Sequence, residues 1–262
     1  MSSNYILQIT FNGACQNQCP YCSRPNDPSL NMTVEEVIEN IEFFLGKGNI
    51  KRFVLSGGEL FDDRFQRLLD HLSQFELGEK VLITSGLGMS ESLTEKIDSF
   101  FNRTVLSITP DVSGFPESEE FEEKLGFYEQ MRRTHVQTNT VIHGKNTGFL
   151  EQTVVRLSRM DIQYPTLTLV FPFGNVIPES GFFVYEEEAV SVISRLANIL
   201  AGNDLTPRIK GVPACYFEED TRTFVGYTIG KGKHYITKHR QKDHTITLEE
   251  NIPFESFPEC EE

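Results

Sequence analysis

The sequence lacks the features of membrane and secreted proteins. No apolar run in its 262 residues approaches the roughly 20 residues of a membrane-spanning helix. The first ten residues, MSSNYILQIT, have neither the basic segment nor the long apolar segment of a signal peptide. We therefore expect a cytoplasmic protein that does not insert into a membrane. Cytosolic thiols stay reduced, so clustered cysteines favour metal binding or catalysis over disulfides.

Positive charge is also scarce. The chain has 24 Lys and Arg against 38 Asp and Glu, which gives a formal net charge of -14. A general nucleic-acid binder needs a basic surface to meet the phosphates, so we expect no nucleic-acid partner. One local exception is the stretch 231–244, where the basic residues are Lys231, Lys233, Lys238, Arg240 and Lys242.

The hydrophobic pattern alternates between strands and helices. Strands are predicted at 5–11, 51–56, 81–85, 104–109, 136–143 and 166–171, and helices at 33–45, around 65–72, from 92 to 100, at 118–133, about 147–160 and 186–200. Thr33 with Glu36 and Ser92 with Glu95 are candidate capping boxes at two of the helix starts. Such units form a parallel sheet, either doubly wound or curled into a barrel. Six units are fewer than the eight of a closed barrel.

This alternation stops after about residue 205. The segment 207–217 is predicted to contain a strand, and 224–238 a hairpin with a Gly-Lys-Gly turn at 230–232. We expect a barrel over 1–204 and a C-terminal covering extension over 205–262, not a second domain.

Three of the five cysteines follow the first predicted strand. Cys15, Cys19 and Cys22 lie in ACQNQCPYCSRP, residues 14–25. A structural zinc site needs four ligands, and no fourth is evident. A [4Fe–4S] cluster held by three thiolates instead leaves one iron open to a small molecule. SGGE, residues 56–59, follows the second predicted strand and would face the same end of the sheet, where ligands collect.

The pattern C-x3-C-x-aromatic-C, followed by Gly-Gly-Glu after the next strand, resembles the radical S-adenosylmethionine (SAM) superfamily with a MoaA-like core. The resemblance covers roughly residues 5–200 and implies a partial (β/α)6 barrel. One departure is Leu60, where the family usually has proline. The alternative is a non-catalytic iron–sulfur or zinc-binding module, which the Gly-Gly-Glu disfavours.

The resemblance implies one [4Fe–4S] cluster on the three cysteines and SAM on its open iron. Tyr21 would contact adenine, Gly57 and Gly58 would let the backbone approach the SAM amine, and Glu59 would fix their loop. Further candidate SAM contacts, each of which is otherwise a satisfied polar group, are Thr84, Ser85, Ser107 and Asn139. The turn at 171–175 would line the adenine side.

Several other residues have two interpretations each. Cys215 is a candidate hydrogen-atom donor or a buried small hydrophobic residue. His143 either faces substrate or is structural, and the role of Asp111 is open. Cys260 resembles a remnant of the auxiliary-cluster cysteines of some relatives, but two cysteines are too few, so we expect no second cluster.

In this family the reduced cluster cleaves SAM to a 5'-deoxyadenosyl radical, which abstracts a hydrogen from a substrate. The resemblance thus implies an oxygen-sensitive enzyme that takes electrons from a flavodoxin or ferredoxin. The basic stretch 231–244 would dock that acidic donor or an anionic substrate, or is simply a solvated hairpin.

Three substrate classes stay open. The first is a peptide or protein side chain, the second a small metabolite of natural-product or cofactor biosynthesis, and the third a glycyl-radical enzyme to be activated. Against the first, the initial strand begins near residue 5, which is expected to leave no room for a leader-peptide domain.

Overall fold

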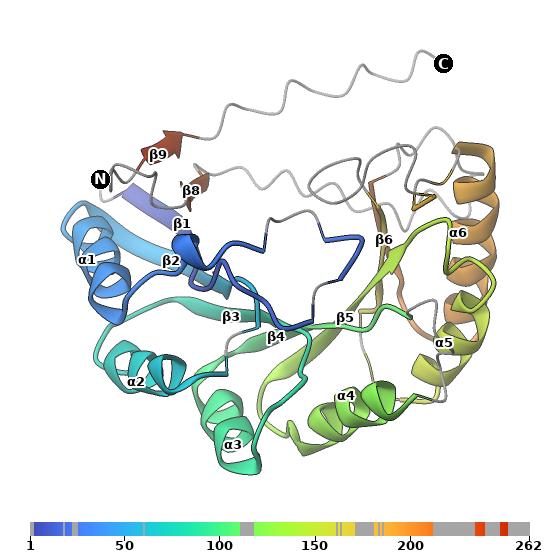
Figure 1. Cartoon of the computed structure of the whole chain (residues 1–262), viewed down its shortest axis with the longest axis horizontal. Coiled ribbons are helices and arrows are strands. Elements are labelled where there is room, and N and C mark those ends of the chain that lie inside the picture. The colour runs from blue at the N-terminus through green and yellow to red at the C-terminus, as the bar shows by residue number, and fades with distance from the viewer. Residues whose placement is uncertain are drawn as a thin grey trace.

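The computed structural model describes residues 3–17, 19–22, 26–59, 61–110, 118–160, 162, 164–170, 181–182, 184, 186–211, 234–238 and 247–250. Within them one sheet has the strand order β7-β6-β5-β4-β3-β2-β1-β8-β9. All neighbours pair in parallel except β8 and β9. Figure 1 shows the sheet curled into a half-barrel with the helices around its outer side. The predicted partial barrel is therefore confirmed.

The element bounds follow the predicted alternation closely. The strands are β1 Ser3–Thr10, β2 Gly48–Ser56, β3 Glu79–Thr84, β4 Arg103–Ser107, β5 His135–Ile142, β6 Thr166–Leu169, β7 Arg208–Lys210, β8 His234–Lys238 and β9 Thr247–Glu250. The helices are α1 Val34–Leu45, α2 Asp63–Leu72, α3 Glu91–Phe100, α4 Glu119–Gln130, α5 Leu150–Leu157 and α6 Glu186–Ala201, with a short 3₁₀ turn at Pro28–Leu30. Among these helices none has the length and apolar character that crossing a membrane requires.

The core lies between the sheet and the helices. Leu7, Phe53 and Leu82 of the first strands join one buried cluster with residues of α1 to α4. Leu167 and Ile209 of β6 and β7 join a second cluster with residues of α5 and α6. Because side chains alternate along a strand, the residues between these positions face the inner, concave side of the sheet.

The helices α1 to α4 each begin at a residue whose side chain caps the helix. At α1 the capping box of Thr33 and Glu36 is present as predicted. At α3 the prediction is wrong, because Ser90 is the N-cap and accepts a hydrogen bond from the Leu93 amide. Ser92 is the second residue of the helix. The earlier start puts Glu91 in the first turn, where its charge suits the helix dipole.

The strands after residue 205 extend both edges of the sheet. β7 pairs in parallel with β6, and β8 pairs in parallel with β1. Of the predicted 224–238 hairpin, residues 224–233 lie outside the described residues; its described end, β8, pairs antiparallel with β9. The division of the chain at residue 204 stays a prediction.

Candidate cluster and cofactor site

The cysteine loop leaves β1 and has a backbone held by asparagine side chains. Cys15, Cys19 and Cys22 are free and half-buried. The Cys15 amide donates to Asn26 Oδ1 (2.8 Å), and Asn26 Nδ2 donates back to the Cys15 carbonyl (2.9 Å). The Cys22 amide donates to the Cys19 carbonyl (3.0 Å), which closes a turn between them. These hydrogen bonds hold the backbone of the loop in place, and none of the three thiols is in a disulfide.

The base of the loop is tied to the segment before α1. Asn31 Oδ1 accepts hydrogen bonds from the amides of Gly13 (2.9 Å) and Ala14 (3.1 Å). The Asp27 amide donates to the Gly13 carbonyl (3.1 Å). Asn26 and Asn31 were not among the residues predicted from the sequence. Asparagines in loops often bond to backbone, but their partners are not readable from spacing.

The thiols influence one another. Burial raises the pKa of Cys19 above its ordinary value, and the neighbouring Cys15 and Cys22 raise it further. A hydrogen bond from Tyr21 and the charge of Lys124 act in the opposite direction. Three thiolates gathered in this way repel, and positively charged iron would relieve that repulsion. The donor set therefore fits an iron–sulfur cluster.

The arrangement differs from a site for one ion. In the part of the chain that the structure describes, no three Cys, His, Asp or Glu side chains converge on a single metal position. In an iron–sulfur cluster each thiolate binds a different iron, so such convergence is not needed.

Gly57 and Gly58 pack directly against the cysteine loop. The Gly58 amide donates to the Asn12 carbonyl (2.6 Å). A Cβ atom on Gly58 would lie 1.8 Å from the Ala14 carbonyl oxygen, and one on Gly57 would lie 2.7 Å from the Asn12 backbone nitrogen. The two glycines are therefore required for the close contact between the loops after β1 and β2. Their approach to the SAM amine stays a prediction.

Glu59 joins three loops through its carboxylate. Thr84 Oγ1 donates to Oε1 (2.6 Å), and the Ser85 amide (3.2 Å), the Ser85 hydroxyl and Asn17 Nδ2 (3.3 Å) donate to Oε2. Asn17 Nδ2 also donates to Ser85 Oγ (2.9 Å). The structure thus brings Glu59, Thr84 and Ser85 together, and Asn17 is a member of the network that sequence analysis missed.

Tyr21 anchors the other side of the loop. It packs against the small buried cluster of Val170 and Phe182, as Val141 also does, and its ring stacks on His143 with centroids 4.9 Å apart and planes at 24°. Burial raises the pKa of Tyr21 well above its ordinary range, and its hydroxyl hydrogen-bonds Cys19 and Thr109. His143 is completely buried in this stack, which favours the structural interpretation of that histidine.

Ser107 and Asn139 are neighbours on the inner side of the sheet. They are register partners on β4 and β5, and both are half-buried. Asn139 Oδ1 accepts a hydrogen bond from Thr168 Oγ1 on β6 (2.6 Å). The remaining candidates Asp111, 171–175, Cys215 and Cys260, and most of the basic stretch 231–244, lie outside the described residues.

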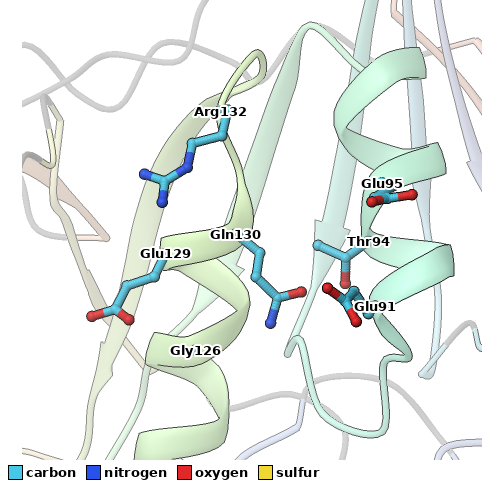
Figure 2. Close-up of a pocket in the computed structure, with 7 residues that line it drawn as sticks. All are labelled: Glu91, Thr94, Glu95, Gly126, Glu129, Gln130 and Arg132. Atoms are coloured by element: carbon cyan, nitrogen blue, oxygen red, sulfur yellow. The ribbon is translucent and has the colours of Figure 1, made fainter.

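A shallow depression of about 450 Å³ lies on the outer side of the barrel, between α3 and α4. Figure 2 shows Gln130 of α4 directed toward Thr94 and Glu91 of α3, while Glu129 and Arg132 point away from α3. It contains none of the predicted site residues, and no cofactor role follows from it.

Several solved structures share the fold of this chain. No curated protein matches the chain. Among solved structures, Streptococcus suis SuiB bound to precursor peptide SuiA is 12% identical, with a TM-score of 0.66 over 90% of this chain and 58% of that one. Native anSMEcpe with bound AdoMet and Cp18Cys peptide is 15% identical, with a TM-score of 0.61 over 79% of this chain and 63% of that one. HydG, a maturase of the [FeFe]-hydrogenase, is 13% identical, with a TM-score of 0.56 over 85% of this chain and 56% of that one.

These similarities establish the fold, and the chain spans about three-fifths of the length of the matched structures. The family model described as the Radical SAM superfamily matches residues 9–141, just over half of the chain. That region includes the three cysteines, the Gly-Gly-Glu and the Glu59 network. The chain belongs to the radical SAM superfamily.

Proposed function

We propose that the chain is an enzyme that binds one [4Fe–4S] cluster through Cys15, Cys19 and Cys22 and SAM beside it. The observation that carries this proposal is the cysteine loop itself, whose backbone is fixed by Asn26 while three thiols stay free. When bound, the cluster and SAM supply reductive cleavage and a radical that takes a hydrogen from substrate, and the protein supplies binding, orientation and exclusion of water.

The remaining candidates would hold SAM. Tyr21 would contact the adenine, and Gly57 and Gly58 would offer backbone to the amine. The Glu59 carboxylate would keep Thr84 and Ser85 in place, since it accepts hydrogen bonds from both. Ser107 and Asn139 would present polar groups to the ribose from the inner side of the sheet.

The substrate that the comparisons favour is a peptide or protein side chain. Two similar structures, SuiB and anSMEcpe, are described as bound to peptides. The alternative substrates are a small metabolite and a glycyl-radical enzyme. Transfer of a labelled hydrogen from the true substrate to 5'-deoxyadenosine distinguishes among the three substrate classes. A deuterated peptide would pass its label into 5'-deoxyadenosine only if it is the substrate. Electrons would come from a flavodoxin or ferredoxin in the cytoplasm.

The first experiment is anaerobic reconstitution followed by iron, sulfide and zinc analysis. We expect about four iron and four sulfide per chain, and 5'-deoxyadenosine after addition of dithionite and SAM. Cys19→Ala should abolish SAM cleavage, and the matched control Cys260→Ala should retain it. One zinc without iron would contradict the proposal, and 5'-deoxyadenosine formation by Cys19→Ala would contradict the ligand assignment.

A further inference from the structure

A lysine stands on the inner side of the barrel, on the strand farthest from the cluster motif in the parallel part of the sheet. Ile209 of β7 is fully buried in the core cluster between the sheet and α6. Alternation along the strand therefore places Arg208 and Lys210 on the opposite, concave face. Lys210 is the last residue of β7. It thus lies at the carboxyl end of the sheet, where parallel barrels bind their ligands.

Lys210 ends a row of polar residues that crosses four strands. It is the register partner of Thr168 on β6. The Thr168 hydroxyl donates to Asn139 Oδ1 (2.6 Å), and Asn139 is the register partner of Ser107. With strands about 4.8 Å apart, the row spans about 14 Å from β4 to β7. It is long enough to contact more than one group of a bound molecule.

The charge of Lys210 is not balanced by its described surroundings. Burial lowers the pKa of Lys210 below its ordinary value, and the neighbouring positive charge of Arg208 lowers it further. No ion pair or hydrogen bond to a carboxylate involves Lys210 among the described residues. Arg208 lies over the Tyr164 ring, with its guanidinium carbon 4.5 Å from the centroid. A partly desolvated cation without a counter-ion is costly, and a bound anion would offset that cost.

This row lies next to the cysteine loop. Tyr21 and Val141 both pack against the small buried cluster of Val170 and Phe182. Val141 is the register partner of Thr168, which is itself the partner of Lys210. The loop that carries the cysteines therefore reaches across the inner side of the sheet to the neighbourhood of Lys210, and Figure 1 shows the described parts of that loop on this side.

We propose that Lys210, with Thr168 and Asn139 beside it, forms a carboxylate-binding subsite inside the barrel. This inference rests on the proposed function, in which SAM and a substrate occupy the same end of the sheet. The carboxylate belongs either to the methionine part of SAM or to the substrate, for example a peptide terminus or acidic side chain. Lys210 is a binding residue in both cases.

The test measures the titration of Lys210 in the full-length protein. Lysines of the anaerobically reconstituted protein are dimethylated with ¹³C-formaldehyde, and the Lys210 signal is assigned with Lys210→Arg. Its pKa is measured alone, with decarboxylated SAM, with SAM, and with SAM plus sodium succinate, at constant ionic strength. A bound carboxylate should raise the pKa by about one unit or more, because a nearby anion favours the charged form. Exposed Lys51 of β2 is the control and should not shift.

The arms separate the two sources of the carboxylate. A shift with SAM but not with decarboxylated SAM assigns the subsite to the SAM methionine, and a further shift only with succinate assigns it to substrate. The Thr168 hydroxyl donates to Asn139 Oδ1 and so orients the Asn139 amide, which means that Thr168→Val should reduce the shift and Thr168→Ser should retain it. If neither SAM nor succinate shifts the pKa of Lys210, the proposed subsite is wrong. If SAM cleavage is retained in that case, only this inference fails; a shift with succinate in a protein that cannot cleave SAM defeats only the proposed function.

Discussion

Gly58 approaches Ala14 so closely that a Cβ atom on the glycine would lie 1.8 Å from the alanine carbonyl oxygen. These residues belong to the loops after β2 and β1, and the same Cβ would lie 2.9 Å from Cys15 Cβ. The Gly-Gly-Glu and the cysteine motif are therefore two halves of one packed unit. We therefore expect a change in either half to reach the thiols through these contacts.

Gly58→Ala should displace the cysteine loop. Backbone atoms form the clash, so relief requires the loops to separate, and overpacking of this kind costs about 1–3 kcal/mol. We expect lower iron content after reconstitution and a lower midpoint of thermal unfolding. Gly126→Ala in α4 is the matched control, because nothing lies within 4 Å of its added Cβ. It should keep its iron and be neutral or slightly stabilised. Normal iron content in Gly58→Ala would contradict the packing argument.

Glu59→Gln should weaken the junction of three loops. The carboxylate accepts hydrogen bonds from Thr84, Ser85 and Asn17. Glutamine replaces one of the two carboxylate oxygens with an NH2 group, which is a donor and would face the donor groups of these residues. An unsatisfied polar group of this kind costs about 1–3 kcal/mol. We expect weaker SAM binding by calorimetry and a lower unfolding free energy in urea.

Exposed Glu95 on α3 offers a control for that change. Glu95→Gln removes the same charge without touching the network and should leave SAM affinity unchanged. If both variants behave alike, net charge and not the Glu59 network sets the affinity.

Tyr21→Phe should raise the pKa of the Cys19 thiol in cluster-free protein. Burial already raises this pKa, and the hydrogen bond from the Tyr21 hydroxyl lowers it, since it stabilises the thiolate. Its loss moves the pH midpoint of Cys19 alkylation by iodoacetamide upward, so at a fixed pH below that midpoint the reaction is slower. Peptide mass spectrometry measures the rate at each pH. An unchanged midpoint would show that the hydrogen bond does not act on the thiolate.

Much of this site was predictable because its signals are local. Thr33 and Glu36 are three residues apart, so their capping box is visible in the sequence and is present in α1. The alternation of strands and helices likewise predicts the half-barrel. Cys15 and Gly58 follow consecutive parallel strands, and such strand ends must meet at one edge of the sheet.

Other parts depend on contacts between distant segments. Asn17 meets Glu59 across 42 positions, and Tyr21 stacks on His143 from another strand end. Nothing in the spacing of these residues distinguishes them from other polar or aromatic residues. The predicted start of α3 was wrong for a local reason. Serine is a favourable N-cap residue at both position 90 and position 92, and only Ser90 is the N-cap in the structure.

Lys124→Met should make the bound cluster harder to reduce. Lys124 lies on α4 with its side chain 5% exposed, where it pairs with Glu120 at 2.7 Å. Its charge favours the thiolate of Cys19, so it reaches the cluster ligands electrostatically. A positive charge near the cluster stabilises the added electron, and its loss should shift the potential negatively by an amount on the order of tens of millivolts. Redox titration followed by electron paramagnetic resonance measures this directly.

Lys96→Met is the control for Lys124, because Lys96 forms a comparable pair with Asp70 but is 42% exposed. Solvent and salt screen such a charge, so its removal should leave the potential unchanged. Lys124→Arg should keep most of the wild-type potential, since it keeps the charge. A negative shift in Lys124→Arg as large as in Lys124→Met would mean that packing of the lysine stem, and not its charge, acts on the cluster. In that case both variants should also lose thermal stability to the same extent.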